Sequence, residues 1–472
     1  MIVISVNSLA QLKIFEYLCQ RIKNRYSNIA FVAFECNARQ IKCIEESAQK
    51  LGINFGIQKA EELPTDNVKI NKNFPPMTWI EKGIYRFKSK KYKTLTDKLF
   101  LRKMIYLNSI IANLNAAQRI IEQYKPNLIL VAEDGVSGNV YLIHEACKYK
   151  IPIIDIPYEV SGKEDFVNLI DEKIKEDSII RFDANASHFH RYIHNKLKKW
   201  IISSSEGELL LFPPELIIAK LEMGLDLPNP WTTHGGYASI LAAESAAMLD
   251  HYKTEQLDSA KLILVGSVYC DALYDSLHSK QIYQEAYYRQ SKIHAGKTSI
   301  LISIPPSYHN SRRESSEFSS YKEMIEQLLS MLVSKELDIS VSLHPAIPQE
   351  DLALIKSFDI KIIDDWIINL IPKYDIFFSI SFSSTIRWAL ACGKPVINYD
   401  AYRHNLKVYD GVPGFNTSQQ LKNIENHLSD LLDDKQYHEL ALQLAKERDK
   451  WGIIDGKNTI RLCQIFDKYI AN

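Results

Sequence analysis

Short apolar runs alternate with segments of helical period along the chain, and this alternation restricts the possible folds more than any other feature. In the first half, strand-like runs lie at 1–6, 28–35, 127–133 and 151–157. Helical patterns lie between them at 8–24, 38–51, 104–124 and 138–149. Strands that alternate with helices are joined by right-handed crossovers into a parallel sheet. The first half therefore predicts a parallel sheet covered by helices.

The second half repeats this pattern. Its strand-like runs lie at 260–266, 298–304, 337–343, 360–364, 374–380 and 394–399. Its helical patterns lie at 320–334, 366–373, 385–392, 417–433 and 435–449. A polar break near 250–260 predicts two doubly wound α/β domains, residues 1–255 and 256–472. The last helical segment, 456–470, has no strand to follow it, so we expect it to pack back across the other domain.

Composition excludes several classes of protein. Lys+Arg and Asp+Glu both total 57 in 472 residues, so no overall charge attracts nucleic acid or an anionic membrane. No apolar run approaches the ~18 residues of a membrane-spanning helix. The start of the chain reads as a β-strand without a basic leader. The seven cysteines show no paired spacing, which predicts reduced thiols in a cytoplasmic protein.

Two adjacent carboxylates lie at the end of the strand at 127–133. Ligands of open parallel sheets bind beyond the carboxyl ends of the strands, so these positions are candidates for chemistry. Glu133 and Asp134 stand there, and Gly135 lets the chain turn. A carboxylate beside a second negative charge suits a general base. The other interpretation, an acid that caps the following helix, stays equally open on these residues alone.

Two further strand ends carry groups suited to phosphate. His344 and Pro345 end the strand at 337–343, where an imidazole can donate to phosphate oxygens or serve only in a turn. Ser383, Ser384 and Thr385 precede the helical segment at 385–392. Hydroxyls and free N–H groups at a helix start can hold an anion, although one of them would suffice as a cap.

These three motifs, in this order, resemble those of GT-B glycosyltransferases, and more narrowly the bacterial sialyltransferases and related Kdo and nonulosonic-acid transferases. Such enzymes carry two acids and a glycine, then His-Pro, then a Ser-Ser/Thr pair. The resemblance implies two Rossmann-like domains facing across a cleft, a CMP-activated donor, inversion, and neither metal nor cofactor. It implies that Glu133 is the base and Asp134 supports it. His344 would meet the donor phosphate with Ser383, Ser384 and Thr385.

One departure from the family concerns positive charge. Several relatives carry a lysine close before His-Pro, whereas Ser342 and Leu343 stand there in this chain. Arg312 and Arg313, in the loop after the strand at 298–304, are the best replacement, because arginine clamps phosphate and carboxylate. Solvated surface arginines are the alternative.

Two histidine-containing stretches are candidate binding sites. His234, Gly235 and Gly236 lie in a Pro/Trp-rich loop that either approaches the donor carboxylate or acceptor sugar closely or is purely structural. The stretch at 187–194 places His190 and His194 four residues apart on one helix face. Because no further ligand follows at a suitable spacing, a solvated basic helix is the favoured interpretation and no metal site is predicted.

The segment 82–103 is strongly basic, with aromatic residues between the charges. It suits an anionic glycan acceptor or peripheral contact with the inner membrane leaflet, while a solvated segment is the alternative. No nucleic-acid-binding pattern accompanies it.

The sequence as a whole thus favours an inverting transferase. We expect it to move a nonulosonic acid (sialic, pseudaminic or legionaminic acid) or Kdo from its CMP form to a surface glycan, lipid-linked or free. Two alternatives stay open. One is another nucleotide-sugar enzyme of the same architecture, such as a UDP-sugar epimerase or a CDP-glycerol-type transferase. The other is a non-catalytic scaffold of polysaccharide assembly.

Overall fold

The computed structural model describes most of the chain. The described residues are 1–60, 93–158, 179–185, 188–204, 207–293, 296–312, 315–344, 347–381, 383–405 and 407–470, with single positions at 163, 167, 170 and 174. The chain divides into two compact units, each built from several stretches. One contains Met1–Leu12, Ser27–Ile153 and Asp177–Ala238, and the other contains Lys13–Tyr26, Ile154–Glu176 and Ser239–Asn472.

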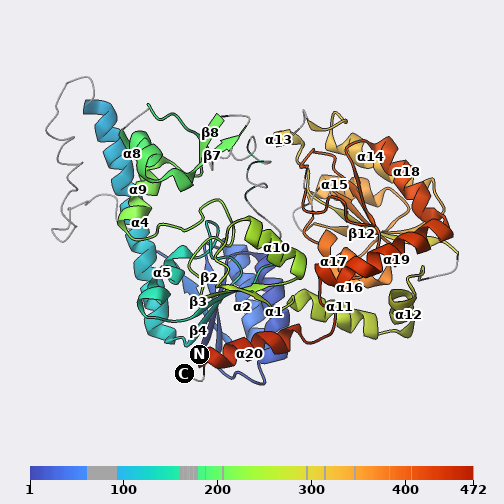
Figure 1. The fold of residues 1–472 in the computed structure, drawn as a ribbon, viewed down its shortest axis with the longest axis horizontal. Coiled ribbons are helices and arrows are strands. Elements are labelled where there is room, and N and C mark those ends of the chain that lie inside the picture. Colours follow the sequence, from blue (N-terminus) through green and yellow to red (C-terminus); the bar gives the residue numbers. More distant parts are fainter. Residues whose placement is uncertain are drawn as a thin grey trace. The chain divides into compact units, whose positions relative to one another are not determined.

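A seven-stranded sheet forms from the first part of the chain (Figure 1). Its strands are β1 (Ile2–Val6), β2 (Ile29–Phe34), β3 (Asn54–Gln58), β4 (Leu128–Val131), β5 (Ile153–Asp155), β9 (Ile240–Ala243) and β10 (Leu262–Leu264). Their order is β10-β9-β5-β4-β1-β2-β3. β1 pairs in parallel with both of its neighbours, so that Ile2 lies beside Ile29 of β2 and beside Leu128 of β4.

Apolar residues on both faces of these strands explain why the sheet is covered. β1 and β2 are buried at every position, which is typical of parallel strands between helical layers. The helices are α1 (Leu9–Ile22), α2 (Ala38–Leu51), α4 (Lys93–Tyr124), α5 (Val140–Lys148), α9 (Pro214–Glu222) and α10 (Ala246–Thr254). On one face, Ala117 and Ile121 of α4 and Ile143 of α5 pack with Val3 and Ile129 in one apolar core.

A six-stranded parallel sheet forms from the later part of the chain. Its strands are β11 (Thr298–Ile304), β12 (Leu337–Leu343), β13 (Lys361–Ile362), β14 (Ile376–Ile380), β15 (Val396–Tyr399) and β16 (Phe415–Ser418). Their order is β13-β12-β11-β14-β15-β16, and every pairing is parallel. Alternate residues such as Ile300, Ile302, Phe378 and Ile397 belong to one apolar core.

Nine helices of the described part of the chain precede, separate or follow these strands. They are α11 (Val268–His278), α12 (Gln281–Arg289), α13 (His309–Arg312), α14 (Tyr321–Val333), α15 (Gln349–Lys356), α16 (Ile367–Leu370), α17 (Ile386–Ala391), α18 (Leu421–Leu432) and α19 (Asp434–Trp451), with a 3₁₀ turn at Ile371–Lys373. Buried residues of α14 and α18, including Met324, Leu328 and Leu428, pack on the core face of the sheet.

A small antiparallel sheet lies between α5 and α9 in the sequence. It contains β6 (Ile180–Arg181), β7 (Ile201–Ser204) and β8 (Gly207–Leu210), in the order β6-β8-β7. The helix α8 (His188–Lys196) and the 3₁₀ turn Lys198–Trp200 precede β7.

The last helix, α20 (Asn458–Ile470), is held by the residues that follow α1 and by α11. The hydroxyl of Tyr26, which follows α1, donates to Asp467 Oδ1 at 2.7 Å, and Arg25 pairs with the same carboxylate. The start of α20 is held by Asp271, whose buried carboxylate accepts hydrogen bonds from the backbone N–H groups of Asn458 and Thr459 at 3.0 and 2.8 Å. These contacts fix α20 against α11 and against the residues that follow α1.

The predicted strands and helices are confirmed, with two corrections. The strand expected at 260–266 is β10, and it pairs with β9 in the seven-stranded sheet instead of joining the second sheet. The helix expected from 417 begins at Leu421, because Phe415–Ser418 pair with β15 as a further strand. The isolated run at 415–418 is too short for a periodic pattern to reveal it.

Both sheets contain a reversal of strand order. In one, β1 and β4 are neighbours with β2 and β5 on their outer sides; in the other, β11 and β14 are neighbours with β12 and β15 outside. Such a reversal opens a crevice at the carboxyl ends of the two central strands, where ligands of doubly wound folds bind. The loops after β1, β4, β11 and β14 are therefore the places to look for chemistry.

All seven cysteines are free thiols. None of the helices in the described part of the chain combines the length and apolar character needed to cross a membrane.

Candidate functional site

Glu133 lies at the reversal point of the seven-stranded sheet, two residues beyond β4. Its side chain is only 4% exposed, and Gln11 Nε2 donates to its Oε1 at 3.3 Å. The amide of Gln11 is oriented by its own Oε1, which accepts the backbone N–H of Asn7 at 3.1 Å. The loop after β1 thus holds the Glu133 carboxylate from one side, as a positioned base requires.

Asp134, next in the sequence, has a different environment. Its Oδ1 accepts the backbone N–H of Gly236 at 3.0 Å, and its Oδ2 accepts that of Ala238 at 2.8 Å. Both carboxylate oxygens are therefore committed to the loop that precedes β9. The adjacent acids are distinguished by these bonds, which sequence alone could not show.

Neither acid caps the next helix. The N-cap of α5 is Asn139, whose side chain accepts the backbone N–H of Leu142 at 3.1 Å. The same Asn139 donates to Ser5 Oγ at 2.9 Å and exchanges hydrogen bonds with Gln58. The capping interpretation of Glu133 and Asp134 is therefore wrong.

The glycines near His234 permit close packing between two loops. A Cβ on Gly236 would lie 1.8 Å from the backbone oxygen of Asp134, and one on Gly235 would lie 1.9 Å from that of Asn229. Gly135 donates its N–H to the carbonyl of Thr233 at 2.8 Å. These close approaches are made within the protein, so binding of a sugar by this loop stays a prediction.

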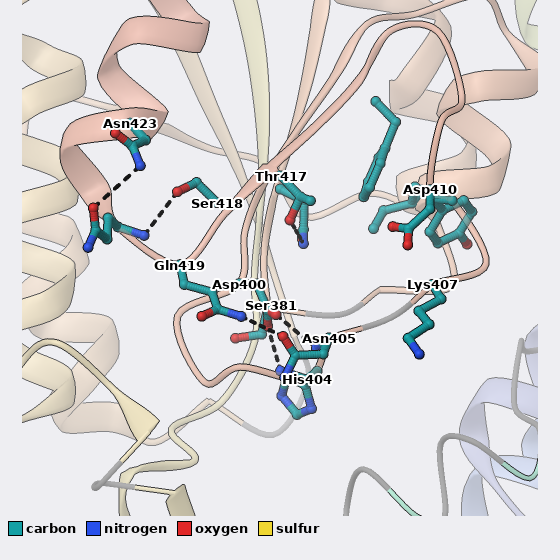
Figure 2. A pocket seen from close by; sticks show the side chains of 15 residues that line it. Ser381, Asp400, His404, Asn405, Lys407, Asp410, Thr417, Ser418, Gln419 and Asn423 are labelled. Atoms are coloured by element: carbon teal, nitrogen blue, oxygen red, sulfur yellow. Dashed lines mark hydrogen bonds between the residues drawn. The ribbon is translucent and has the colours of Figure 1, made fainter.

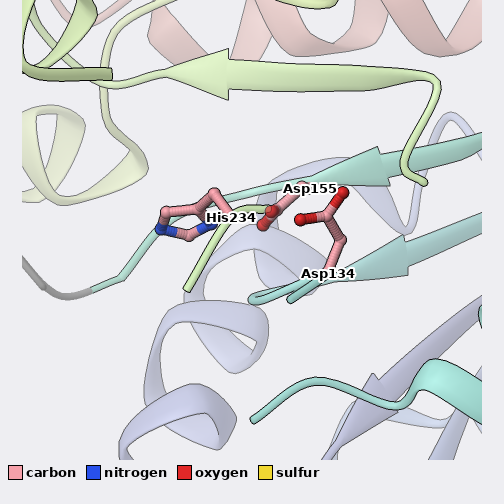
Figure 3. A group of neighbouring side chains, drawn as sticks. All are labelled: Asp134, Asp155 and His234. Atoms are coloured by element: carbon pink, nitrogen blue, oxygen red, sulfur yellow. The ribbon is translucent and has the colours of Figure 1, made fainter. Parts of the chain in front are cut away.

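Three buried side chains at this edge of the sheet have the composition of a metal site. Figure 3 shows Asp134, Asp155 and His234, of which one ligand atom each lies within 4.8 Å of the others. Each carboxylate oxygen of Asp134 already accepts one backbone N–H, which leaves one lone pair on each oxygen. The histidines of α8 do not join this group; His190 and His194 lie against the ring of Phe182, with centroids 5.5 and 6.1 Å away.

We expect chelation to leave transfer unchanged. Excess EDTA should not lower the rate, and added Mg²⁺ or Mn²⁺ should change it less than about threefold. A metal that bridged the phosphate would supply several kcal/mol, so its removal would lower the rate far more than that. Initial rates measured after dialysis against chelator test this. Loss of activity that one divalent ion restores would contradict it and would make Asp155 and His234 the first ligands to mutate.

His344 stands where the sequence placed it, directly after β12. Its backbone N–H donates to the carbonyl of Ile304 at the end of β11, at 3.0 Å. His344 is exposed overall, but neighbouring atoms keep part of the water away from its imidazole. This desolvation lowers the pKa of His344 and favours its neutral form at pH 7. Pro345, the second residue of the motif, lies outside the described residues, as does Arg313.

The hydroxyl side chains after β14 do not all point freely toward a possible anion. Ser383 Oγ and Thr385 Oγ1 are 2.6 Å apart and share a hydrogen bond, and the N–H of Thr385 donates to Ser383 Oγ at 3.3 Å. The helix that follows, α17, has only six residues. Ser383 and Thr385 therefore organise the turn, and Ser384 between them is half-buried.

Arg312 does not behave as a solvated surface arginine. It is only 8% exposed, and its Nη1 donates to the carbonyl of Tyr402 at 3.2 Å. It also lies close enough to His404 to lower the pKa of that imidazole. The alternative of a solvated Arg312 is therefore wrong. The charge of Arg312 lies near Tyr402 and His404, in the loop that follows β15.

A polar pocket of about 580 Å³ opens beside the reversal point of the six-stranded sheet, at the carboxyl ends of β14, β15 and β16 (Figure 2). Its lining is rich in side-chain amides: Asn398, Asn405, Gln419, Gln420 and Asn423. Ser381 and Ile386 line it on either side of the predicted Ser383–Thr385 motif.

Three atoms of this lining are buried without a hydrogen-bond partner among the described residues: Ser381 Oγ, Asn398 Oδ1 and His404 Nε2. Buried polar atoms are paired in more than about 90% of cases, so these three atoms can accept or donate hydrogen bonds to a group that enters the pocket. Sequence reasoning missed Asn398 and His404. The sequence did contain one indication of this pocket, because Asp400 directly follows the apolar run 394–399 and so stands at a strand end.

The helix α17 is fixed by a buried ion pair that sequence reasoning also missed. Arg387 is fully buried; its Nη1 pairs with Glu244, which follows β9, and its Nη2 donates to the carbonyl of Tyr158 at 3.0 Å. Tyr252 donates to the other oxygen of Glu244 at 2.9 Å. No motif signals a pair separated by 143 residues.

The basic segment 82–103 lies largely outside the described part of the chain. Within it, Lys103 is buried and pairs with Glu222 at 3.0 Å. This lysine therefore packs against α9 and is not part of a solvated surface.

No family model and no curated protein matches the sequence. Several solved structures share its fold at low identity. The chain is similar over 99% of its length to 98% of the glycotransferase of kitacinnamycin, at 12% identity and a TM-score of 0.54. It is similar over its full length to 98% of the calicheamicin glycosyltransferase CalG4, at 10% identity and a TM-score of 0.51.

The third similar structure is that of S. aureus MnaA, solved with UDP. All of this chain aligns with 96% of MnaA, at 12% identity and a TM-score of 0.51. At these identities the likeness concerns the fold. The two Rossmann-like α/β domains, each with its reversal of strand order, thus give this chain the GT-B fold that these proteins share.

Proposed function

We propose that the protein is an inverting glycosyltransferase that moves a nonulosonic acid or Kdo from its CMP form to a surface glycan. The observation that carries the proposal is the polar pocket of about 580 Å³ beside the β11–β14 reversal, with its three unpartnered buried atoms. Its volume suits part of a nucleotide sugar. The order of the three sequence motifs supports the choice of CMP.

Glu133 is the proposed base. The side-chain amide of Gln11 donates to its carboxylate, whereas both oxygens of Asp134 accept backbone N–H groups. In the reaction, Glu133 takes the proton of the acceptor hydroxyl, whose oxygen forms a bond to C2 of the donor sugar. The bond from C2 to the phosphate oxygen breaks, and CMP leaves with the electron pair, which inverts C2.

The charge that develops on the phosphate needs donors in the second sheet. His344 and the turn Ser383–Thr385, at the ends of β12 and β14, are the proposed donors, with Ser381 beside them. Electrostatic stabilisation of a leaving phosphate by preoriented donors requires neither a metal nor a cofactor.

A scaffold function is less well supported. A scaffold has no need of a buried carboxylate held by a side-chain amide at one reversal point and unpartnered polar atoms at the other. The unpartnered atoms lower stability unless a ligand binds them, because a buried unsatisfied group costs about 1–3 kcal/mol.

The proposal is tested by the nucleotide that stabilises the protein. A ligand present at ~100 times its dissociation constant adds ~2.7 kcal/mol, which is visible in thermal unfolding. We expect CMP to raise the melting temperature, and CDP, UDP and AMP to do so less. Stabilisation by UDP alone would instead favour a UDP-sugar enzyme. Release of CMP from a CMP-sugar panel, only when acceptor glycan is present, then separates a transferase from a scaffold.

A further inference from the structure

The pocket beside β14, β15 and β16 contains one histidine, His404, with an unusual environment. Its ring is 9% exposed and lines the pocket, and its Nε2 has no partner among the described residues. Its backbone N–H donates to Asp400 Oδ1 at 2.8 Å, which fixes the loop and leaves the ring for another purpose. A buried imidazole without a partner is costly unless it meets a ligand.

The surroundings hold this ring in place. The ring of Tyr308 meets it edge-on with centroids 6.0 Å apart, and the ring of Tyr402 does so at 6.4 Å. Arg312 donates to the carbonyl of Tyr402 at 3.2 Å and so anchors the same cluster. The imidazole is therefore preoriented before any ligand arrives.

Charges of both signs face His404. Burial, and after it the positive charge of Arg312, lower the pKa of His404 to about 4, while Asp400 opposes the shift. The Asp400 carboxylate also accepts the backbone N–H of Asn405 at 2.9 Å, so it is engaged on its own loop. The other charged groups of the lining are Lys407 and Asp410, both exposed.

We propose that His404 is an anion-binding residue of this pocket, and that a carboxylate or phosphate group of the ligand enters beside it and causes the imidazole to take up a proton. The anion would offset the positive charge of Arg312 and supply the missing partner of Nε2. No bond is made or broken in this step; one proton moves from solvent to the ring. The identity of the ligand rests on the proposed function.

The proton makes affinity depend on pH in a defined direction. The free protein does not hold this proton above about pH 4. A nearby anion favours the charged form and raises the pKa in the complex. The complex then binds more protons than the free protein, so affinity falls as pH rises toward the pKa of the complex.

Two sources of the anion fit this chemistry, the phosphate of CMP and the carboxylate of the sugar acid. Titration calorimetry with CMP, cytidine and N-acetylneuraminate separates them, because cytidine has neither anion and N-acetylneuraminate has only the carboxylate. Proton uptake is measured from the difference in binding enthalpy between two buffers of equal pH and different ionisation enthalpy.

The wild-type protein and the His404→Asn variant are compared at pH 5, 6, 7 and 8. We expect wild type to take up on the order of one proton at pH 6 and to lose about tenfold more affinity than the variant between pH 5 and pH 8. The phosphate of CMP titrates in the same range, but that effect is equal in both proteins. His427→Asn on α18, which lies outside the pocket lining, is the matched control and should behave as wild type.

Uptake with CMP but not cytidine identifies the phosphate, and uptake with N-acetylneuraminate identifies the carboxylate; either supports the inference. His404→Gln, checked with His404→Asn for unchanged thermal unfolding, guards against a folding defect. If wild type binds CMP with the same proton stoichiometry as both variants, His404 has no such role, while the proposed function stands. If wild type binds none of the three ligands, both the function and the inference are overturned.

Discussion

The Glu133→Gln variant is expected to lose sugar transfer by about 10²–10⁴-fold, the usual contribution of a general base. The glutamine keeps an Oε1 that can accept from Gln11 Nε2, so the fold and CMP binding should be retained. Initial rates of CMP release with saturating donor and acceptor, together with calorimetric binding of CMP, measure the two effects separately.

Two further variants show whether the loss of transfer is specific to Glu133. Glu35→Gln changes another glutamate that follows a strand of the same sheet, β2, and should leave the rate unchanged. Asp134→Asn removes an acceptor from the loop at 236–238 and should lower stability before it affects chemistry. Normal transfer by Glu133→Gln, with loss in a stably folded Asp134→Asn protein, would show that the second acid is the base.

The Arg387→Met variant is expected to lower the free energy of unfolding by about 3–5 kcal/mol. The substitution leaves the Glu244 carboxylate, only 1% exposed, without its ion-pair partner. Breaking one half of a buried pair costs this much because the remaining charge stays desolvated. The shift in urea midpoint, with the slope of the transition compared, measures the effect.

The double variant Arg387→Met with Glu244→Leu should recover most of this loss, because apolar replacement of a whole buried pair is often neutral. Lys253→Met removes one partner of an exposed pair on α10 and should change stability by less than about 1 kcal/mol. An Arg387→Met protein as stable as wild type, or a double variant worse than the single one, would show that the pair does not hold α17.

The sequence alone indicated the class of fold and most strands of the two parallel sheets, although it did not reveal β3, β9 or β16. Apolar runs such as Ile29–Phe34 and Ile376–Ile380 are buried at every position, so their hydrophobicity marks them as central parallel strands. Glycine and proline residues marked the ends of the helical patterns between these strands. The polar residues directly after β4, β12 and β14 could be located because the carboxyl end of a strand is fixed once the strand is known.

The roles of those polar residues were decided by the tertiary structure. Glu133 and Asp134 are equivalent in the sequence, and only the backbone N–H groups of Gly236 and Ala238, more than 100 positions away, commit Asp134 to a structural bond. Hydrogen-bond partners are set by the approach of distant loops, which leaves no local pattern.

The same reason explains the pocket and the ion pair. Asn398, His404 and Arg387 carry no motif, and their importance comes from burial, which depends on how β14, β15 and the loop at 400–405 converge. β10 shows the same limit for a strand, since its short run fits either sheet by composition and its pairing with β9 decides which one it joins. Local periodicity therefore determined what each segment is, and only long-range packing determined which segments meet and which polar groups remain for a ligand.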